Sequence, residues 1–156
     1  MTGMRRSLPA EADTLALGSV LAAALAPGMV IYLIGELGAG KTTLARGLLR
    51  GLGYAGKVKS PTFTLVEVYE FSRLYLYHFD FYRFTGSNNP RELGEAGFRE
   101  YFNPQSVCLV EWPDQAAGLP AADLRVVLDV AGSGRNVSIF ADSEAGASCL
   151  KKFQAQ

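Results

Sequence analysis

The chain has 156 residues, of which 49% are hydrophobic and 19% charged, a length and composition typical of one globular domain with its own core. Fifteen basic residues balance fifteen acidic ones, which excludes a strongly basic DNA-binding coat and an acidic tail. Two apolar stretches, 15–26 and 28–34, are shorter than the ~20 residues of a membrane span, and no secretory signal precedes them. We therefore expect one domain over 1–156, cytoplasmic and without membrane contact.

Helix and strand patterns alternate along the chain. Helical spacing, with proline or glycine at the ends, predicts helices over 10–25, 44–52 and 90–101. Apolar, β-branched and aromatic runs predict strands over 29–34, 62–71, 73–81, 107–111, 124–130 and 136–140. The closely spaced pairs 62–71 with 73–81 and 124–130 with 136–140 predict antiparallel hairpins, whereas 141–156 resembles a partly ordered tail. The pattern indicates an α/β fold with a mixed sheet, a parallel core and flanking helices.

The two cysteines give no sign of a metal or disulfide framework. Cys108 and Cys149 lie in apolar surroundings without a C-x-x-C spacing, which excludes a zinc ribbon and suits a reducing cytosol. We interpret both as packing residues.

A phosphate-binding loop follows the first buried strand. Its eight residues fit G-x-x-x-x-G-K-[ST]: Gly35, Glu36, Leu37, Gly38, Ala39, Gly40, Lys41 and Thr42. Glycines let backbone N–H groups turn toward phosphate oxygens, and the helix that follows presents its positive end to the same anion. Lys41 would reach the β- and γ-phosphates of ATP, and the Thr42 hydroxyl would bind Mg²⁺, with Thr43 in the first helical turn. The alternative is a glycine-rich turn with an incidental lysine.

Two acids end apolar strands and could complete this site. Asp80 follows the run 74–79 and Glu111 follows 107–110, where a P-loop protein places the acids that hold hydrated Mg²⁺ and orient water. Alternatively, each acid caps a turn. Hydroxyls over 60–64 could sense the γ-phosphate or only begin a strand. His78, the single histidine, is interpreted as a packing residue rather than a general base.

Four linked motifs carry a family resemblance. They are the loop 35–43, the stretches 59–67 and 78–83, and Val110-Glu111-Trp112-Pro113. In order and spacing they resemble the bacterial TsaE (YjeE) family, over residues 8 to about 140. The resemblance implies a P-loop ATPase required for the N6-threonylcarbamoyladenosine modification of tRNA. It also implies the TsaB–TsaD pair as partners, with tRNA contacted indirectly through that complex.

The resemblance also assigns residues. It places the phosphate loop on 35–42, Mg²⁺ ligands on Thr42 and Glu111, and the other essential acid on Asp80. It brings Glu11 and Arg135 near the adenosine. The chain departs from the commonest family pattern at Glu36, at Asn89-Pro90 and at Asp114, positions that concern contacts with partners.

Other function classes remain open from the sequence. A small-molecule kinase could use the same loop, although no arginine cluster follows the core strands to form a lid. A binding module could hold nucleotide without hydrolysing it. Direct sequence-specific reading of tRNA has the least support, because neither a basic stripe nor an RNA-binding motif is present.

Overall fold

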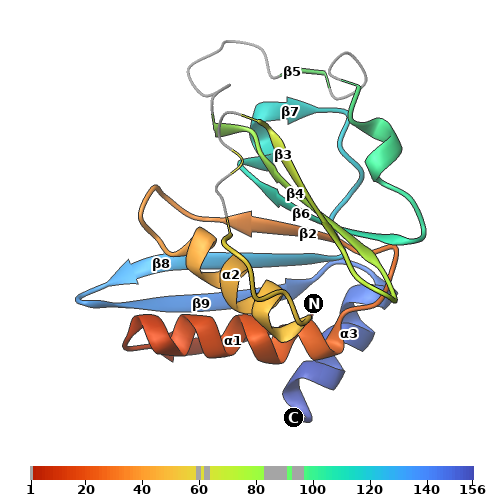
Figure 1. Ribbon diagram of the computed structural model, residues 1–156. Coiled ribbons are helices and arrows are strands. Elements are labelled where there is room, and N and C mark those ends of the chain that lie inside the picture. Colours follow the sequence, from red (N-terminus) through yellow and green to blue (C-terminus); the bar gives the residue numbers. More distant parts are fainter. Residues whose placement is uncertain (1, 59–60, 62–63, 83–90, 93–96) are drawn as a thin grey trace.

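A computed structural model describes residues 2–58, 61, 64–82, 91–92 and 97–156 (Figure 1). Within these ranges the α-helices are α1 (Glu11–Ala24), α2 (Lys41–Gly51) and α3 (Glu144–Gln154). Short 3₁₀ turns are η2 (Arg99–Tyr101) and η3 (Pro113–Gln115). The strands are β1 (Thr2–Leu8), β2 (Val30–Ile34), β3 (Val66–Glu70), β4 (Tyr75–Asp80), β5 (Arg91–Glu92), β6 (Ser106–Glu111), β7 (Ala116–Ala117), β8 (Leu124–Ala131) and β9 (Gly134–Ala141).

A seven-stranded sheet organises the molecule, in the order β1-β9-β8-β2-β6-β4-β3. The four central strands β8, β2, β6 and β4 run parallel. Hairpin partners β9 and β3 and the edge strand β1 add antiparallel pairs. This confirms the predicted mixed sheet with a parallel core. The short strands β5 and β7 pair separately.

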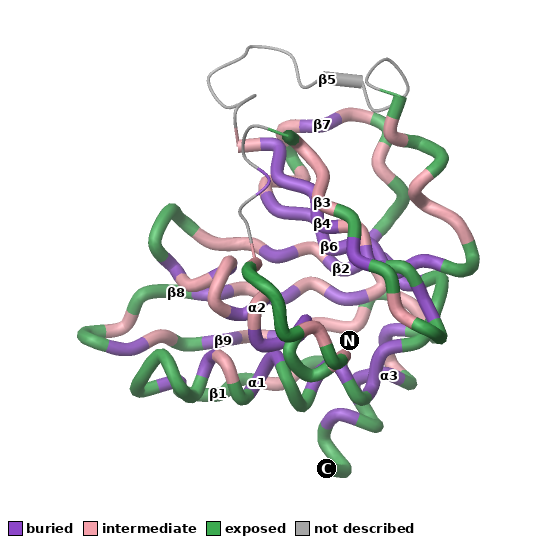
Figure 2. Tube along the Cα trace, in the orientation of Figure 1, coloured by how far each residue is buried: buried purple, intermediate pink, exposed green. Residues whose placement is uncertain are grey.

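Helices α1, α2 and α3 pack on one face of the sheet, and the larger hydrophobic core lies between them and that face. Inward side chains of α1, α2 and α3 join alternate residues of β2, β6 and β8 in one buried cluster. Figure 2 marks the buried residues of the chain as purple segments of the trace. A smaller cluster covers the opposite face of β2, β4 and β6, where Phe79 and Phe81 meet aromatic rings of 98–102. Strand residues alternate between faces, so β2, β4 and β6 each contribute residues to both clusters.

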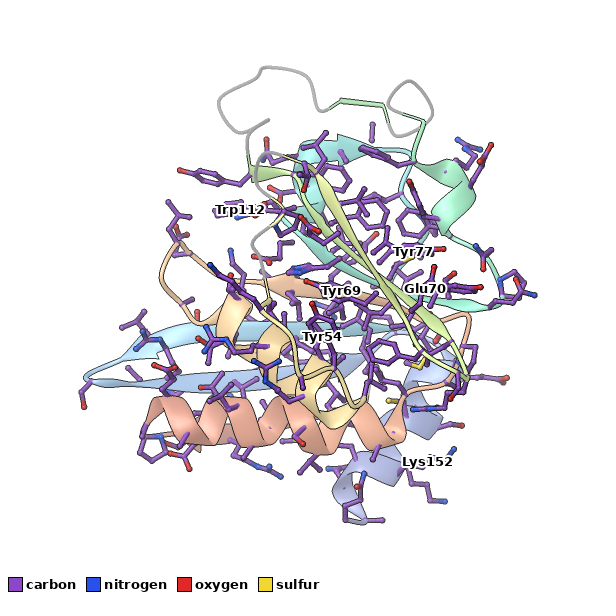
Figure 3. The ribbon with its side chains drawn as sticks, in the orientation of Figure 1. Tyr54, Tyr69, Glu70, Tyr77, Trp112 and Lys152 are labelled. Atoms are coloured by element: carbon purple, nitrogen blue, oxygen red, sulfur yellow. The ribbon has the colours of Figure 1, made fainter. Side chains whose placement is uncertain are left out.

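Helices α1 and α2 approach each other closely because glycine lies at their crossing. A Cβ atom added to Gly47 would lie 2.2 Å from the carbonyl oxygen of Leu15, and one added to Gly18 would lie 2.5 Å from that of Leu44. Tyr54, just after α2, packs edge-to-face on Tyr69 of β3 with 4.9 Å between ring centroids (Figure 3). These contacts fix α2, and with it the phosphate loop, against the sheet.

The structure differs from the sequence prediction in three segments. Residues 2–8, for which no element was predicted, form β1, paired with β9 along its whole length. The helix predicted over 90–101 is wrong where the structure describes it, since 91–92 is a strand and only 99–101 is helical. The tail predicted over 141–156 is instead helix α3, which buries Cys149, Leu150 and Phe153. Asn89 and Pro90 lie outside the described residues.

The interpretation of the two cysteines as packing residues agrees with the structure. Cys108 and Cys149 are both free and buried, as packing residues should be. Over the described part of the chain, no helix combines the length and apolar character needed to cross a membrane.

Candidate functional site

The glycine-rich loop connects β2 to α2. Gly38 and Gly40 have φ angles of 79° and 103°, in the left-handed region that side chains disfavour. Gly40 is the N-cap of α2 and has no side chain to cap the helix, so the amino end of α2 is free to receive an anion. The predicted helix began at 44, but the observed one begins at Lys41, which brings Lys41, Thr42 and Thr43 into its first turn.

Lys41 is folded back over the loop. Its side chain is only 6% exposed, Nζ donates to the carbonyl oxygen of Gly35, and Nζ lies 4.2 Å from the centroid of the Trp112 ring. Burial lowers the pKa of Lys41, while the nearby carboxylates, Glu111 and Asp80 foremost, oppose the shift. The ammonium group is thus held among acids in a partly desolvated position, where an incoming anion would interact with it strongly.

Asp80 and Glu111 lie side by side at the ends of neighbouring strands. They are register partners on β4 and β6, and they are 4% and 3% exposed. Asp80 Oδ1 accepts a hydrogen bond from the backbone N–H of Tyr82 at 2.8 Å. Glu111 Oε2 lies 2.6 Å from Nε2 of His78. The carboxyl ends of the parallel strands therefore bring two buried acids to the edge where the phosphate loop begins.

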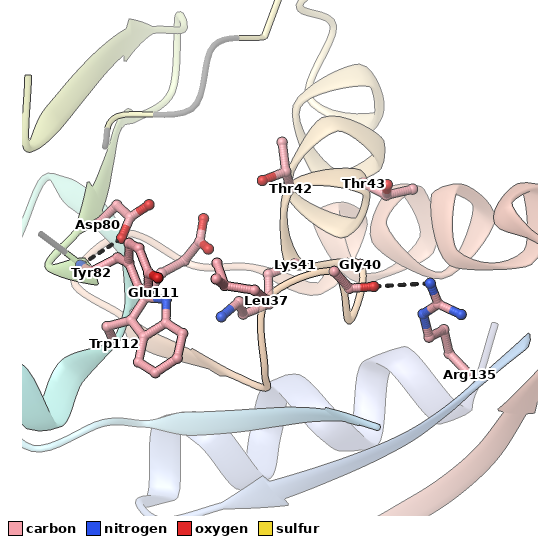
Figure 4. A pocket seen from close by; sticks show the side chains of 11 residues that line it. Leu37, Gly40, Lys41, Thr42, Thr43, Asp80, Tyr82, Glu111, Trp112 and Arg135 are labelled. Carbon is pink, nitrogen blue, oxygen red and sulfur yellow. Dashed lines mark hydrogen bonds between the residues drawn. The ribbon is translucent and has the colours of Figure 1, made fainter. Parts of the chain in front are cut away.

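These groups line one pocket of about 270 Å³ (Figure 4). Its lining residues are Leu37, Gly38, Gly40, Lys41, Thr42, Thr43, Asp80, Tyr82, Glu111, Trp112 and Arg135. In Figure 4 the acids lie on one side of the loop and Arg135 on the other. Most of the residues assigned from the sequence thus converge from the loop between β2 and α2 and from α2, β4, β6 and β9.

Arg135 and Glu11 flank a second hollow of about 210 Å³ beside the loop, which also touches Gly40 and Thr43. Arg135 binds the loop itself: Nε donates to the carbonyl oxygen of Ala39 at 3.1 Å, and Nη2 donates to that of Gly38 at 2.9 Å. Glu11 forms an exposed ion pair with Arg46 at 3.5 Å. The two residues assigned to the adenosine are therefore neighbours of one hollow that adjoins the phosphate loop.

Three loop residues lie outside the main pocket. Ala39 is a buried residue of the loop. Gly35 and Glu36 instead line a third hollow of about 470 Å³, together with Asp114 and Asp129. Of the stretch 60–64, the positions 60, 62 and 63 lie outside the described residues, and Thr64 donates from Oγ1 to Glu67 at 3.2 Å.

Trp112 and Tyr82 line the pocket although sequence analysis assigned neither to it. Trp112 has a φ angle of 55°, a left-handed conformation that costs a non-glycine residue of order 1–3 kcal/mol. This turn directly after Glu111 places the indole ring on Lys41, and the ring also packs on Tyr82 at 5.1 Å. The sequence signal for Trp112 was its position directly after a strand-end acid, within the motif Val110-Glu111-Trp112-Pro113.

Comparisons with known proteins identify the family of the chain. The family model described as "Threonylcarbamoyl adenosine biosynthesis protein TsaE" matches residues 8–137. A curated relative from Haemophilus influenzae, named tRNA threonylcarbamoyladenosine biosynthesis protein TsaE, is 41% identical and covers 98% of this chain and 99% of its own length. A relative of the same name from Bacillus subtilis is 42% identical over 82% of this chain and 78% of its own.

A solved structure shows the same fold. The crystal structure of Bacillus subtilis YdiB superposes with a TM-score of 0.80 at 33% identity, covering 99% of this chain and 95% of that one. Family model, relatives and fold thus agree over the segment that contains the phosphate loop, Asp80 and Glu111. The chain belongs to the TsaE family of threonylcarbamoyladenosine biosynthesis proteins.

Proposed function

We propose that the protein is a Mg²⁺-dependent ATPase required for the threonylcarbamoyladenosine modification of tRNA, and that it acts on the TsaB–TsaD complex and resets it by ATP hydrolysis. The observation that carries the proposal is the shared pocket of Lys41, Asp80 and Glu111, all buried, at the amino end of α2. Family membership supports the biological process.

The loop and Lys41 would bind the phosphates. The amino end of α2 carries partial positive charge, and the ammonium group of Lys41 lies within the same pocket. On binding, Nζ would exchange its bond to the Gly35 carbonyl for phosphate oxygens. The hollow beside Glu11 and Arg135 is placed to take the nucleoside, because it adjoins the loop at Gly40 and Thr43.

The oxygen donors in the pocket fit Mg²⁺. Thr42 supplies a hydroxyl, and Asp80 and Glu111 supply carboxylates. Within the described ranges no group of three or more His, Cys, Asp or Glu side chains is close enough to hold a metal alone. Such a site suits Mg²⁺, which uses one or two carboxylates, several waters and substrate phosphates. When bound with ATP, the ion neutralises charge on the phosphates.

The two acids would also orient the attacking water. Asp80 and Glu111 face the pocket as register partners, so one carboxylate can hold the metal while the other accepts a hydrogen bond from water. Arg135 is the arginine among the pocket-lining residues, and its guanidinium is already bonded to loop carbonyls. An arginine that stabilises the transition state can raise the rate by ~10³ to 10⁵, so we expect slow turnover by the protein alone and stimulation by its partners.

ATP hydrolysis tests the proposal. The rate is measured for the purified chain with and without Mg²⁺, then with TsaB–TsaD and tRNA. Lys41→Ala and Glu111→Ala are the test variants, and Glu70→Ala, an exposed acid at the far end of β3, is the matched control. We expect TsaB–TsaD and tRNA to stimulate ATP hydrolysis by the wild type and by Glu70→Ala. Lys41→Ala and Glu111→Ala should lose this stimulation.

Three other outcomes would contradict it. An unchanged rate in the presence of the partners removes the link to TsaB–TsaD. Transfer of phosphate to a small acceptor indicates a kinase. Tight nucleotide binding without hydrolysis under any condition indicates a binding module.

A further inference from the structure

His78 is a buried polar residue that the proposed function leaves without a role. Its side chain is fully buried on β4, and Nε2 lies 2.6 Å from Oε2 of Glu111. Its other ring nitrogen, Nδ1, is the one buried side-chain polar atom of the described residues that lacks a hydrogen-bond partner. Buried polar atoms are normally paired, so a histidine retained at this position calls for an explanation.

Sheet register explains how His78 reaches Glu111. His78 pairs with Leu109 and Asp80 pairs with Glu111 across the parallel strands β4 and β6. His78 and Glu111 are therefore diagonal neighbours, and because side chains alternate along each strand, both lie on the face that carries α2. Both strands are interior to the sheet, which fixes the two backbones relative to each other.

The proposed metal ligand sets the direction of this hydrogen bond. A carboxylate that binds a metal ion only accepts hydrogen bonds, so Nε2 donates to it. Nδ1 has no partner within the described part of the chain, so the contact with Glu111 is the hydrogen bond that orients the ring. The bond engages Oε2 of Glu111 rather than Oε1.

We propose that His78 is a positioning residue that holds the Glu111 carboxylate in the orientation required for Mg²⁺-dependent nucleotide binding. The inference rests on the proposed function, in which Glu111 is a metal ligand. Hydrogen bonds to metal-binding carboxylates commonly change metal affinity or activity by about 10- to 100-fold when removed. His78 touches neither nucleotide nor metal in this role, so it acts only through Glu111.

The test separates the metal from the nucleotide. Trp112 is the single tryptophan and lines the pocket, so its fluorescence reports ATP binding. ATP is titrated in EDTA, and then Mg²⁺ is titrated at fixed ATP. His78→Asn and His78→Leu remove the hydrogen-bond donor at the position of Nε2. In His78→Gln the side-chain amide places an N–H donor close to that position.

We expect His78→Asn and His78→Leu to raise the Mg²⁺ concentration at half-saturation by about 10- to 100-fold, with ATP affinity in EDTA within about twofold of the wild-type value. His78→Gln should restore most of the Mg²⁺ response. If His78→Leu does not fold, the comparison of Asn with Gln still decides the question.

Leu76→Ala is the matched control. Leu76 is buried on β4 two residues before His78, on the same face, and its truncation weakens the sheet without touching Glu111. A similar Mg²⁺ shift in Leu76→Ala, or an unchanged Mg²⁺ response in His78→Asn, overturns the inference.

Failure of the proposed function would look different. In that case the wild-type protein itself shows no Mg²⁺ dependence, and Glu111→Ala changes nothing. If Glu111→Ala loses the Mg²⁺ response of the wild type but the His78 variants keep it, the role of His78 is overturned and the proposed function is not.

Discussion

Lys41 and Trp112 form a cation–π pair at the centre of the pocket, with Nζ 4.2 Å from the ring centroid. The two residues come from different elements, α2 and the turn after β6. The left-handed backbone of Trp112 is what directs its ring across the pocket. The contact links the phosphate loop to the strand that carries Glu111.

Truncating Trp112 should weaken nucleotide binding. A cation–π contact contributes about 0.5–2 kcal/mol, so Trp112→Leu should raise the Kd for ATP by about 2- to 30-fold, and Trp112→Phe should lie between. Calorimetry is the appropriate measurement, because the variants lack the fluorophore. Equal affinity of the wild type and Trp112→Leu would show that the ring does not help to hold Lys41.

The pKa of Lys41 predicts how stability changes with pH. Burial lowers this pKa below the usual lysine value, so the folded protein disfavours the protonated form. This penalty lowers the free energy of unfolding in full at pH values below the lowered pKa, where Lys41 is protonated in both the folded and the unfolded chain. The penalty disappears as the pH rises toward the usual pKa of lysine. The wild type should therefore gain stability relative to Lys41→Met between pH 7 and pH 10. Urea unfolding at both pH values measures the difference, and a wild-type loss relative to the variant would contradict the direction of the shift.

The crossing of α1 and α2 predicts that Gly47→Ala destabilises the protein. The added Cβ would lie 2.2 Å from the Leu15 carbonyl oxygen, so the helices must separate, and overpacking of this kind costs about 1–3 kcal/mol. Ser19→Ala, at an exposed position of α1, is the control and should leave stability unchanged or slightly higher, since alanine favours helix. Thermal unfolding compares the two variants. A Tm for Gly47→Ala equal to that of the control would mean that the helices can separate at no cost.

The phosphate loop and the strand-end acids could be predicted from the sequence because their signals are local. Glycine spacing marks the loop, and an apolar run that ends in a carboxylate marks Asp80 and Glu111. The pairing of Asp80 with Glu111 across neighbouring strands could not be predicted, because strand order depends on packing between distant segments.

The ends of the chain show why other elements were missed. Strand β1 has little apolar alternation, and its conformation comes from pairing with β9. Helix α3 looked like a tail, but its N-cap Ser143 accepts a hydrogen bond from Gly146 and donates one to Asp123 at 2.6 Å. Asp123 in turn accepts from the backbone N–H of Val30. The contact of Ser143 with Asp123 could not be predicted from the sequence, whereas the buried residues Cys149, Leu150 and Phe153 do recur at helical spacing, a signal that was overlooked.

The two cysteines should resist thiol reagents in the folded protein. Burial raises the pKa of the Cys108 thiol to about 12 and that of Cys149 to about 11, and only the thiolate reacts readily. At pH 8 we expect negligible labelling by iodoacetamide in native buffer and labelling of both cysteines in 6 M guanidinium. Cys149 is the more informative of the two, because it packs on the inner side of α3. Rapid labelling of Cys149 alone in native buffer would show that α3 detaches from the sheet, whereas slow labelling of both would show that helix and sheet open only together.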